Sequence, residues 1–329
     1  MNMNTRPKVS VLMPNLNSGS YVIDAIKSVE SQTFKDFEVI ICDSGSQDGS
    51  LEELKHFESR DSRVRLFNIP KNGVYSGWND CIKRASGEYI YFATTDDLFS
   101  KNFLEVLVVL LDNNPSIDIG FTKLWTIDNK NHKDLSVWES LTAYLYTKNS
   151  FKHSHVRERY AEIERFFYFS HLIISANQML IRRSLFTKTG LFDESFGNAA
   201  DIKWQLDALQ FTDIIYAKDA DASWRRHDKQ ITKEDPNVWV RDKVKILVQF
   251  LEKNPSMNDE FIHKGIDLVK LKLYKNVKGV LKDLFLFKLS FRSIFLILEM
   301  VPFFKNKKFQ KIAFAKHIFK GRNKGIKYI

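Results

Sequence analysis

Two adjacent carboxylates, Asp96 and Asp97, directly follow a short apolar segment, residues 89–93, whose composition predicts a buried strand. Placing both charges in an apolar core without partners would cost several kcal/mol, so they are expected to face water, a cation or a ligand rich in hydrogen-bond donors. Ligands gather at strand ends in open α/β sheets. The pair is therefore either a ligand site or a solvated turn that caps the next helix.

Three more polar loops follow predicted strands in the first part of the chain. Residues 8–13 form the first predicted strand, and the loop PNLNSGS follows it. Residues 37–42 form the second, which ends in DSGSQDGS, and residues 64–69 form the third, which runs into PKNG. These loops contain the side chains most able to bind a polar ligand.

A helical pattern separates each loop from the next strand. One helix is predicted to begin near Tyr21 with Ser20 as its N-cap, and the next has Ser50 and Glu53 as a capping-box pair. A third is predicted over about residues 76–85. This alternation predicts a parallel, doubly wound sheet whose loops all open on one edge.

The pattern becomes less regular after the apolar helix predicted at residues 103–114. One or two strands are expected within 117–127, and the polar segment 128–165 is expected to be an insertion on the acceptor side. A strand at 178–182 and a helix at 200–210 follow. The strand DIIYA then precedes the cluster WRRH at residues 224–227.

The chain has 329 residues, of which 44% are hydrophobic, enough for a globular core. The net charge of +10 is unevenly distributed, because residues 240–329 carry 21 Lys and Arg against 7 Asp and Glu, whereas residues 1–239 carry 29 against 33. A basic C-terminal region favours a polyanionic partner such as a membrane surface. Nucleic acid is not expected, since no base-reading module is apparent.

Residues 281–304 are strongly apolar but are interrupted by Lys288, Arg292 and Glu299, which argues against a transmembrane helix. The segment is expected to be an amphipathic helix in the membrane interface, or a helical subdomain that packs on the body or on another subunit of a homo-oligomer. We therefore divide the chain into residues 1–239 and a basic amphipathic helical region, residues 240–329.

The cysteines and the N-terminus indicate an intracellular protein. Cys42 and Cys81 have no spacing typical of a zinc site or a disulfide framework, so both are expected to be reduced core residues. The N-terminal residues lack the long apolar run of a signal peptide. The expected location is the cytoplasm, either free or peripheral on the inner face of the membrane.

Taken in order, the first hundred residues resemble the family 2 glycosyltransferases, which have the GT-A fold, a Rossmann-like doubly wound mixed sheet. The matching segments are SVLMPNLN, SVESQT, FEVIICDSGSQDGS, NGVYSGWNDCIKRASGEYIYF and TTDD. The motif TTDD has Thr94 where the family commonly has its first acidic residue, and Leu16 replaces an aromatic residue of the nucleotide-binding turn.

The resemblance implies a role for each loop. The Asp96-Asp97 pair is expected to hold Mn²⁺ or Mg²⁺, with Asp97 as a metal ligand and Asp96 on the ribose or the metal, and His227 near the metal or diphosphate. Asp201, at the start of a late helix, is expected to be the general base, and Arg225 and Arg226 are expected to neutralise phosphate. The nucleotide-binding residues implied are Pro14, Asn17, Asp43, Asn72, Gly73 and Asp96.

The first loop, PNLNSGS, lacks the motifs of two other enzyme classes. A dinucleotide enzyme would need a Gly-x-Gly-x-x-Gly turn in the first loop, and a nucleotidyltransferase would need a Gly- and Lys/Arg-rich phosphate loop there. We therefore expect a metal-dependent inverting glycosyltransferase that moves a sugar from a nucleotide-sugar, UDP-linked on the Asp43 match, to a glycan or lipid-linked acceptor in surface polysaccharide synthesis. The alternative is a catalytically degenerate family member that serves as a scaffold.

Overall fold

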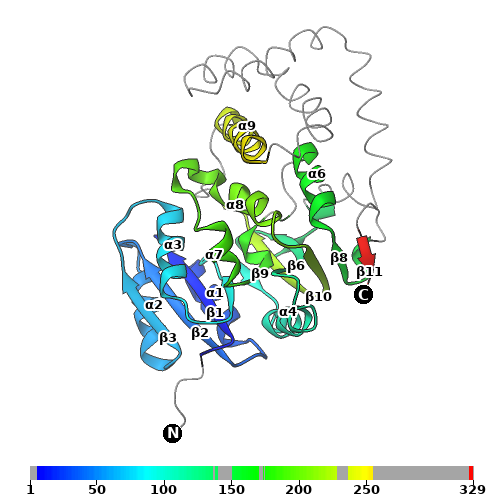
Figure 1. The fold of residues 1–329 in the computed structure, drawn as a ribbon. Coiled ribbons are helices and arrows are strands. Elements are labelled where there is room, and N and C mark those ends of the chain that lie inside the picture. The colour runs from blue at the N-terminus through cyan, green and yellow to red at the C-terminus, as the bar shows by residue number, and fades with distance from the viewer. Residues whose placement is uncertain are drawn as a thin grey trace.

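The computed structural model describes residues 6–135, 138–139, 150–169, 173, 175–227, 236–254 and 326–328. One mixed sheet forms its centre, with strand order β11-β8-β10-β6-β9-β4-β1-β2-β3 (Figure 1). Strands β5 and β7 pair with β10 and β6 outside that order. The α/β mixed sheet expected from the sequence is confirmed.

The N-terminal part of the sheet is parallel and alternates with helices, as predicted. The elements are β1 (Val9–Asn15), α1 (Tyr21–Glu30), β2 (Phe37–Asp43), α2 (Ser50–Arg60), β3 (Val64–Asn68), α3 (Val74–Arg84) and β4 (Tyr89–Phe92). Strands β2 and β4 are buried along their whole length, because helices cover both faces of a parallel sheet. Asn15 lies opposite Asp43, and Asp43 opposite Asn68, so the three polar loops begin at the same edge.

The remaining strands make the sheet mixed. Strand β9 runs antiparallel to both β4 and β6, whereas β6 and β10 are parallel. The elements are β5 (Leu98–Phe99), α4 (Phe103–Asp112), β6 (Ile119–Ile127), β7 (Lys133–Asp134), η1 (Ser150–Lys152), β8 (His155–Arg157), α6 (Arg159–Phe169), η2 (Ala176–Gln178), β9 (Met179–Arg182), α7 (Leu185–Thr189), η3 (Glu194–Ala199), α8 (Ala200–Ala208), β10 (Ile214–Arg225), α9 (Pro236–Lys253) and β11 (Ile326–Tyr328).

The structure differs from the sequence in how the first two helices are capped. The capping box of Ser50 and Glu53 is wrong, because Gly49 is the N-cap and Ser50 is already helical. Asp48 takes over the capping role, accepting hydrogen bonds from the N–H and the hydroxyl of Ser50 at 3.1 and 2.6 Å. Ser20 is at the N-cap of α1 as predicted, but its side chain makes no capping hydrogen bond.

The predicted boundary at residues 239 and 240 falls inside α9, which lies beside α8 (Figure 1). Ile246, Leu247 and Phe250 of this helix are buried in the same core as the sheet. Helix α9 therefore packs on the body through these three residues, and the division of the chain at residue 239 stays a prediction. The amphipathic segment predicted at residues 281–304 lies outside the described residues.

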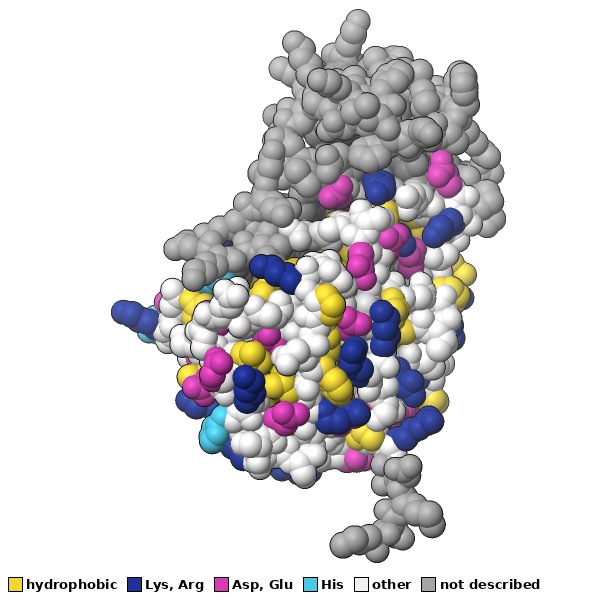
Figure 2. All heavy atoms as spheres, turned by 90° about the vertical axis from the view of Figure 1, so that its left-hand side faces the viewer, with side chains coloured by type: hydrophobic (Ala, Val, Ile, Leu, Met, Phe, Trp, Pro, Cys, Tyr) yellow, Lys and Arg dark blue, Asp and Glu magenta, His cyan; other side chains and the backbone are white. Residues whose placement is uncertain are grey.

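Surface and core features bear on the charge and cysteine predictions. The face that carries α2, β3 and α3 shows basic and acidic side chains interspersed (Figure 2). Cys42 and Cys81 are both free and buried, as expected. In the described part of the chain, no helix combines the length and the apolar character needed to cross a bilayer.

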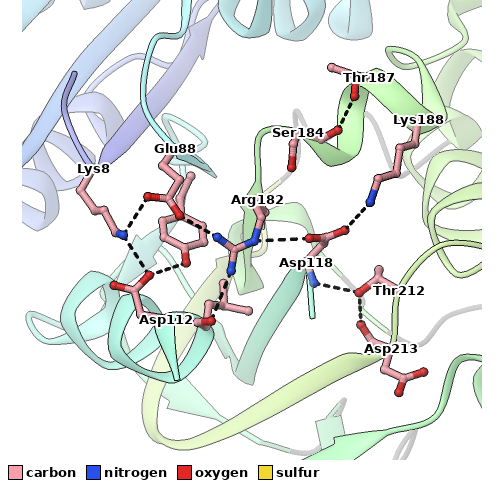
Figure 3. Close-up of polar contacts among 12 residues, drawn as sticks. Lys8, Glu88, Asp112, Asp118, Arg182, Ser184, Thr187, Lys188, Thr212 and Asp213 are labelled. Atoms are coloured by element: carbon pink, nitrogen blue, oxygen red, sulfur yellow. Dashed lines mark hydrogen bonds and ion pairs between the residues drawn. The ribbon is translucent and has the colours of Figure 1, made fainter. Parts of the chain in front are cut away.

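The edge of the sheet opposite the polar loops is occupied by a network of ion pairs (Figure 3). Lys8, before β1, contacts Glu88 and Asp112 at 2.8 and 2.9 Å. Arg182 bridges Glu88 and Asp118 at 2.6 and 3.3 Å. This network joins β1, β4, β6, β9 and α4, and its side chains are already paired with one another.

Candidate active site

The acidic segment after β4 is a four-residue turn in which Asp97 points inward. The Asp97 N–H donates to the Thr94 carbonyl at 3.2 Å, and the Thr94 hydroxyl donates to Asp97 Oδ2 at 2.6 Å. Asp97 Oδ1 accepts the Arg225 N–H at 2.8 Å, and the residue is only 5% exposed. Burial, and then the charge of Asp96, raise the pKa of the Asp97 carboxyl well above its ordinary value.

Asp97 as a metal ligand stays a prediction from the sequence, and the geometry shows what its side chain contacts within the protein. Both of its oxygens accept hydrogen bonds within the protein, so the side chain holds the turn against β10. Asp96 occupies the corner of the turn, and its side chain is 34% exposed. Of the two carboxylates, Asp96 is the one available to a ligand.

Asp96 lies beside His227, and the sequence analysis expected each of them near the metal or substrate. Asp96 Oδ2 lies 3.2 Å from His227 Nε2, and the imidazole also contacts the Tyr21 ring at 5.1 Å between centroids. A carboxylate oxygen and an imidazole nitrogen at one point are donors that suit Mn²⁺. In the described ranges no group of three or more His, Cys, Asp or Glu is arranged to hold a metal. A metal here would therefore take further ligands from substrate and water.

Arg225 is held by contacts within the protein, and its role with phosphate stays a prediction. Its Nε donates to the Asp96 carbonyl at 2.8 Å, its Nη1 to the Asp128 carbonyl at 2.9 Å, and its Nη2 to Asp24 Oδ2 at 3.3 Å. The side chain is 1% exposed, so its guanidinium cannot reach a diphosphate without breaking these contacts. Arg226 is exposed, and its N–H donates to the Ile127 carbonyl at 2.9 Å.

The loops after β1 and β2 are joined through Asn15, a residue to which the sequence gave no role. Its Nδ2 donates to Asp43 Oδ1 at 2.8 Å and to the hydroxyls of Ser46 and Ser50 at 3.1 Å each. Asp43 Oδ2 accepts the N–H groups of Gly45 and Ser46 at 2.8 and 2.9 Å. Asp43 is fully buried in an Asx-type turn, and its contact with the base stays a prediction.

The exposed part of the same two loops is formed by Asn17 and Gln47. Asn17 adopts a left-handed conformation with φ of 52°, which Asn tolerates better than most residues. Its Oδ1 accepts the Gln47 N–H at 2.9 Å, and its own N–H donates to the Ser46 hydroxyl at 2.9 Å. These contacts fix the two loops against each other, with Asn17 facing solvent.

The other nucleotide residues predicted from the sequence lie at the same edge. Pro14 is half-buried at the end of β1, and its carbonyl accepts the Thr95 hydroxyl at 3.5 Å, which links the first loop to the acidic turn. Asn72 and Gly73 are exposed directly before α3. Gly73 has φ of +105°, which few other residues adopt, so it is the N-cap that turns the chain into α3.

The predicted base, Asp201, lies in the first turn of α8, where its Oδ1 accepts the Ile202 N–H at 2.8 Å. Burial raises the pKa of Asp201 to about 6, while a hydrogen bond from the Tyr75 hydroxyl opposes that rise. A carboxyl group with a pKa near neutrality can take a proton at physiological pH and release it again. Asp201 therefore has the electrostatic character of a general base.

Aromatic residues that the sequence reading missed connect Asp201 to the end of β4. Tyr75 contacts the rings of Trp78 and Phe192 at 5.2 and 5.3 Å, and Trp78 stacks on Phe92 at 4.7 Å. Phe92 is the last residue of β4, two positions before Thr94. Asp201 and the acidic turn are thus joined by one packed cluster, which the spacing of YSGW at the start of α3 could have indicated.

Comparison with known proteins identifies this architecture. Residues 1–349 of TarS from S. aureus, solved in complex with UDP-GlcNAc, match 96% of this chain and 90% of theirs, with a TM-score of 0.62 at 18% identity. The mannosyltransferase PcManGT from Pyrobaculum calidifontis, solved with GDP-Man and Mn²⁺, matches 97% of this chain and 86% of its own at 15% identity and a TM-score of 0.53. The fold is therefore GT-A.

The sequence comparisons then give the family. The model of glycosyl transferase family 2 matches residues 10–189, more than half of the 329 residues, and the chain belongs to that family. An uncharacterized glycosyltransferase of Rickettsia felis is 40% identical over 107 residues, which are 32% of this chain but only 18% of that relative. The putative teichuronic acid biosynthesis glycosyltransferase TuaG of Bacillus subtilis is 35% identical over 103 residues, 31% of this chain and 41% of that protein.

Proposed function

We propose that this protein is a metal-dependent inverting glycosyltransferase that uses a nucleotide-sugar donor. The observation that carries the proposal is the pairing of Asp96 with His227 at the sheet edge where the loops of Asn15, Asn17 and Asp43 meet. A cation site beside preformed loops suits a nucleoside diphosphate, whose negative charges need a partner.

In the proposed site, Asp96 and His227 would hold Mn²⁺ or Mg²⁺ next to the donor diphosphate. The cation supplies positive charge that stabilises the departing diphosphate. Asp97 and Arg225 hold the acidic turn in place. The outer faces of the loops at Pro14, Asn17, Asn72 and Gly73 border the nucleoside.

Asp201 acts as the base in this proposal. Its carboxylate takes the proton of an acceptor hydroxyl while that oxygen forms a bond to the anomeric carbon and the bond to the diphosphate breaks. A single displacement of this kind inverts the anomeric centre, and the electron pair of the broken bond leaves with the nucleoside diphosphate. The pKa of about 6 leaves Asp201 ionised, and so able to accept that proton, at neutral pH.

The finer assignments rest on the likenesses and on charge. We propose UDP as the nucleotide, because TarS was solved with UDP-GlcNAc, and surface polysaccharide synthesis because of the relative named for teichuronic acid. The acceptor is then a glycan or lipid-linked sugar. A position on the cytoplasmic membrane face follows from the 21 Lys and Arg against 7 Asp and Glu of residues 240–329.

The test is release of UDP or GDP from a panel of their sugars, with and without Mn²⁺, by the protein and by Asp96→Asn and Lys188→Gln. Asp96→Asn is expected to lose at least 100-fold in metal-dependent turnover, since it removes the charged ligand. Lys188→Gln removes an exposed ion pair at the opposite edge and should leave turnover unchanged. Absence of turnover on every donor, with or without metal, would favour the scaffold alternative.

A further inference from the structure

We infer that Tyr21 is a positioning residue for the proposed metal pair, holding the His227 imidazole against Asp96 through its ring. Tyr21 is the first residue of α1, directly after the nucleotide loop of β1. Its ring contacts Arg225, the last residue of β10, and His227, two residues further along the chain. This inference rests on the proposed function, because it concerns the same site.

The Tyr21 ring contacts two side chains that are two residues apart in the chain, Arg225 and His227. The Tyr21 ring lies 4.9 Å from the Arg225 guanidinium carbon and 5.1 Å from the His227 ring centroid, the latter at an interplanar angle of 37°. The Tyr21 hydroxyl donates to Asn129 Oδ1 at 2.9 Å, which fixes the outer end of the side chain. The Tyr21 side chain is thus held by contacts on its ring and by a hydrogen bond from its hydroxyl.

His227 needs an external contact to keep its orientation. It lies two residues beyond the last residue of β10, where pairing with β6 ends at Arg225 and Ile127. An imidazole rotates about two side-chain bonds, so a metal-facing nitrogen is kept in place by the groups packed around the ring. Within the described residues, the recorded partners of this ring are Asp96 and Tyr21.

Arg225 gives the Tyr21 ring a fixed support. Its guanidinium is bonded to the Asp96 carbonyl, the Asp128 carbonyl and the Asp24 carboxylate. The cation lies against the ring in the range where a cation–π attraction is significant. Because the same guanidinium also holds the Asp96 backbone, Tyr21 joins both members of the metal pair to one rigid group.

The experiment compares Tyr21→Leu with Tyr21→Phe by direct metal binding. Mn²⁺ is titrated into the full chain in the presence of UDP, and free Mn²⁺ is measured by its EPR signal. Tyr21→Leu, which loses the ring, is expected to weaken Mn²⁺ binding about fivefold, whereas Tyr21→Phe, which keeps it, stays within about twofold of the wild type. Thermal unfolding of each variant shows whether the fold is intact.

Tyr160→Leu is the matched control. Tyr160 is 53% exposed, and its ring lies over the Arg159 guanidinium at 4.9 Å, the same separation as Tyr21 from Arg225. Its replacement should leave Mn²⁺ binding unchanged. Equal binding by wild type and Tyr21→Leu would overturn the inference, as would an equal loss in Tyr21→Leu and Tyr21→Phe, which would assign the effect to the hydroxyl.

Asp96→Asn separates this inference from the proposed function. If the wild type binds Mn²⁺ and Asp96→Asn does not, the metal assignment stands, and the Tyr21 variants then decide the positioning role alone. If Asp96→Asn binds Mn²⁺ as well as the wild type, the metal assignment fails and the role of Tyr21 at that site fails with it.

Discussion

Replacing the proposed base by its neutral isostere, Asp201→Asn, should abolish transfer and at the same time stabilise the fold. Asn keeps an oxygen for the Ile202 N–H, which donates to Asp201 Oδ1 at 2.8 Å, but carries no charge. Burial raises the pKa of Asp201 from 3.8 to about 6. That difference corresponds to about 3 kcal/mol against the ionised form in the native state, and solvent at the partly exposed carboxyl makes this an upper limit.

The sign of the pH dependence follows from proton binding. Between pH 3.8 and about 6 the native protein binds more protons at Asp201 than the unfolded chain does, so this group lowers stability as the pH rises through that interval. Asp201→Asn and the wild type should therefore be about equally stable near pH 4. Above pH 7 the variant should be more stable by about 1 to 3 kcal/mol.

The assay is urea unfolding of both proteins at several pH values between 4.5 and 8, with transfer measured in parallel. Turnover by Asp201→Asn is expected to fall by a factor of about 10² to 10⁴. Asp207→Asn, on the same helix, is the control, because it breaks an ion pair with Lys203 at 2.7 Å and should not increase stability. A stability difference between Asp201→Asn and wild type that does not change with pH would refute the raised pKa of Asp201. Retained turnover by Asp201→Asn would refute the role of Asp201 as the general base.

Two further predictions concern residues around the site and the sheet. Tyr75→Phe removes the hydrogen bond that lowers the pKa of Asp201, so the acid limb of the pH–rate profile should move to higher pH, and an unchanged limb would contradict that bond. Gly87→Ala should cost about 1 to 3 kcal/mol in urea unfolding, because a Cβ there would lie 2.6 Å from the Ser10 backbone nitrogen. Gly77→Ala is the control. Gly77 lies within α3, and the atoms nearest to an added Cβ are 3.6 Å away, so the change should be neutral or stabilising.

Local pattern was sufficient to predict the strand ends, and hence the edge at which the site lies. The predicted strands 8–13 and 37–42 are apolar and short, and they end within two residues of the ends of β1 and β2 as observed. The loops after them are rich in Gly, Ser and Asn, and helices follow at regular spacing. Such repetition permits few topologies other than a parallel sheet with its loops together. The structure shows this arrangement, because Asn15 at the end of β1 lies opposite Asp43 at the end of β2.

Contacts between distant segments could not be predicted in the same way. Arg225 lies 97 residues from Asp128 and 201 from Asp24, and its burial depends on the carbonyl and carboxylate that these residues place around it. In the sequence it is one of two adjacent arginines after a strand, and nothing local separates it from the exposed Arg226. Similarly, Asp43 hydrogen-bonds to Asn15, which comes from another strand. The local pattern around Asp43 does not reveal that contact, so the residue was expected to face a ligand.

The division of roles between Asp96 and Asp97 follows from the turn that contains them. Thr94 accepts the Asp97 N–H with its carbonyl and donates its hydroxyl to the Asp97 carboxylate, so residue 97 is drawn back toward the end of β4. A four-residue turn exposes its central positions, which are Thr95 and Asp96, and Thr95 is covered by the first loop. Asp96 is left as the exposed carboxylate. Threonine at residue 94 therefore removes one acidic group from the motif but supplies the hydroxyl that orients the turn, and this favours a metal held by Asp96 and His227 over one held by the two adjacent aspartates.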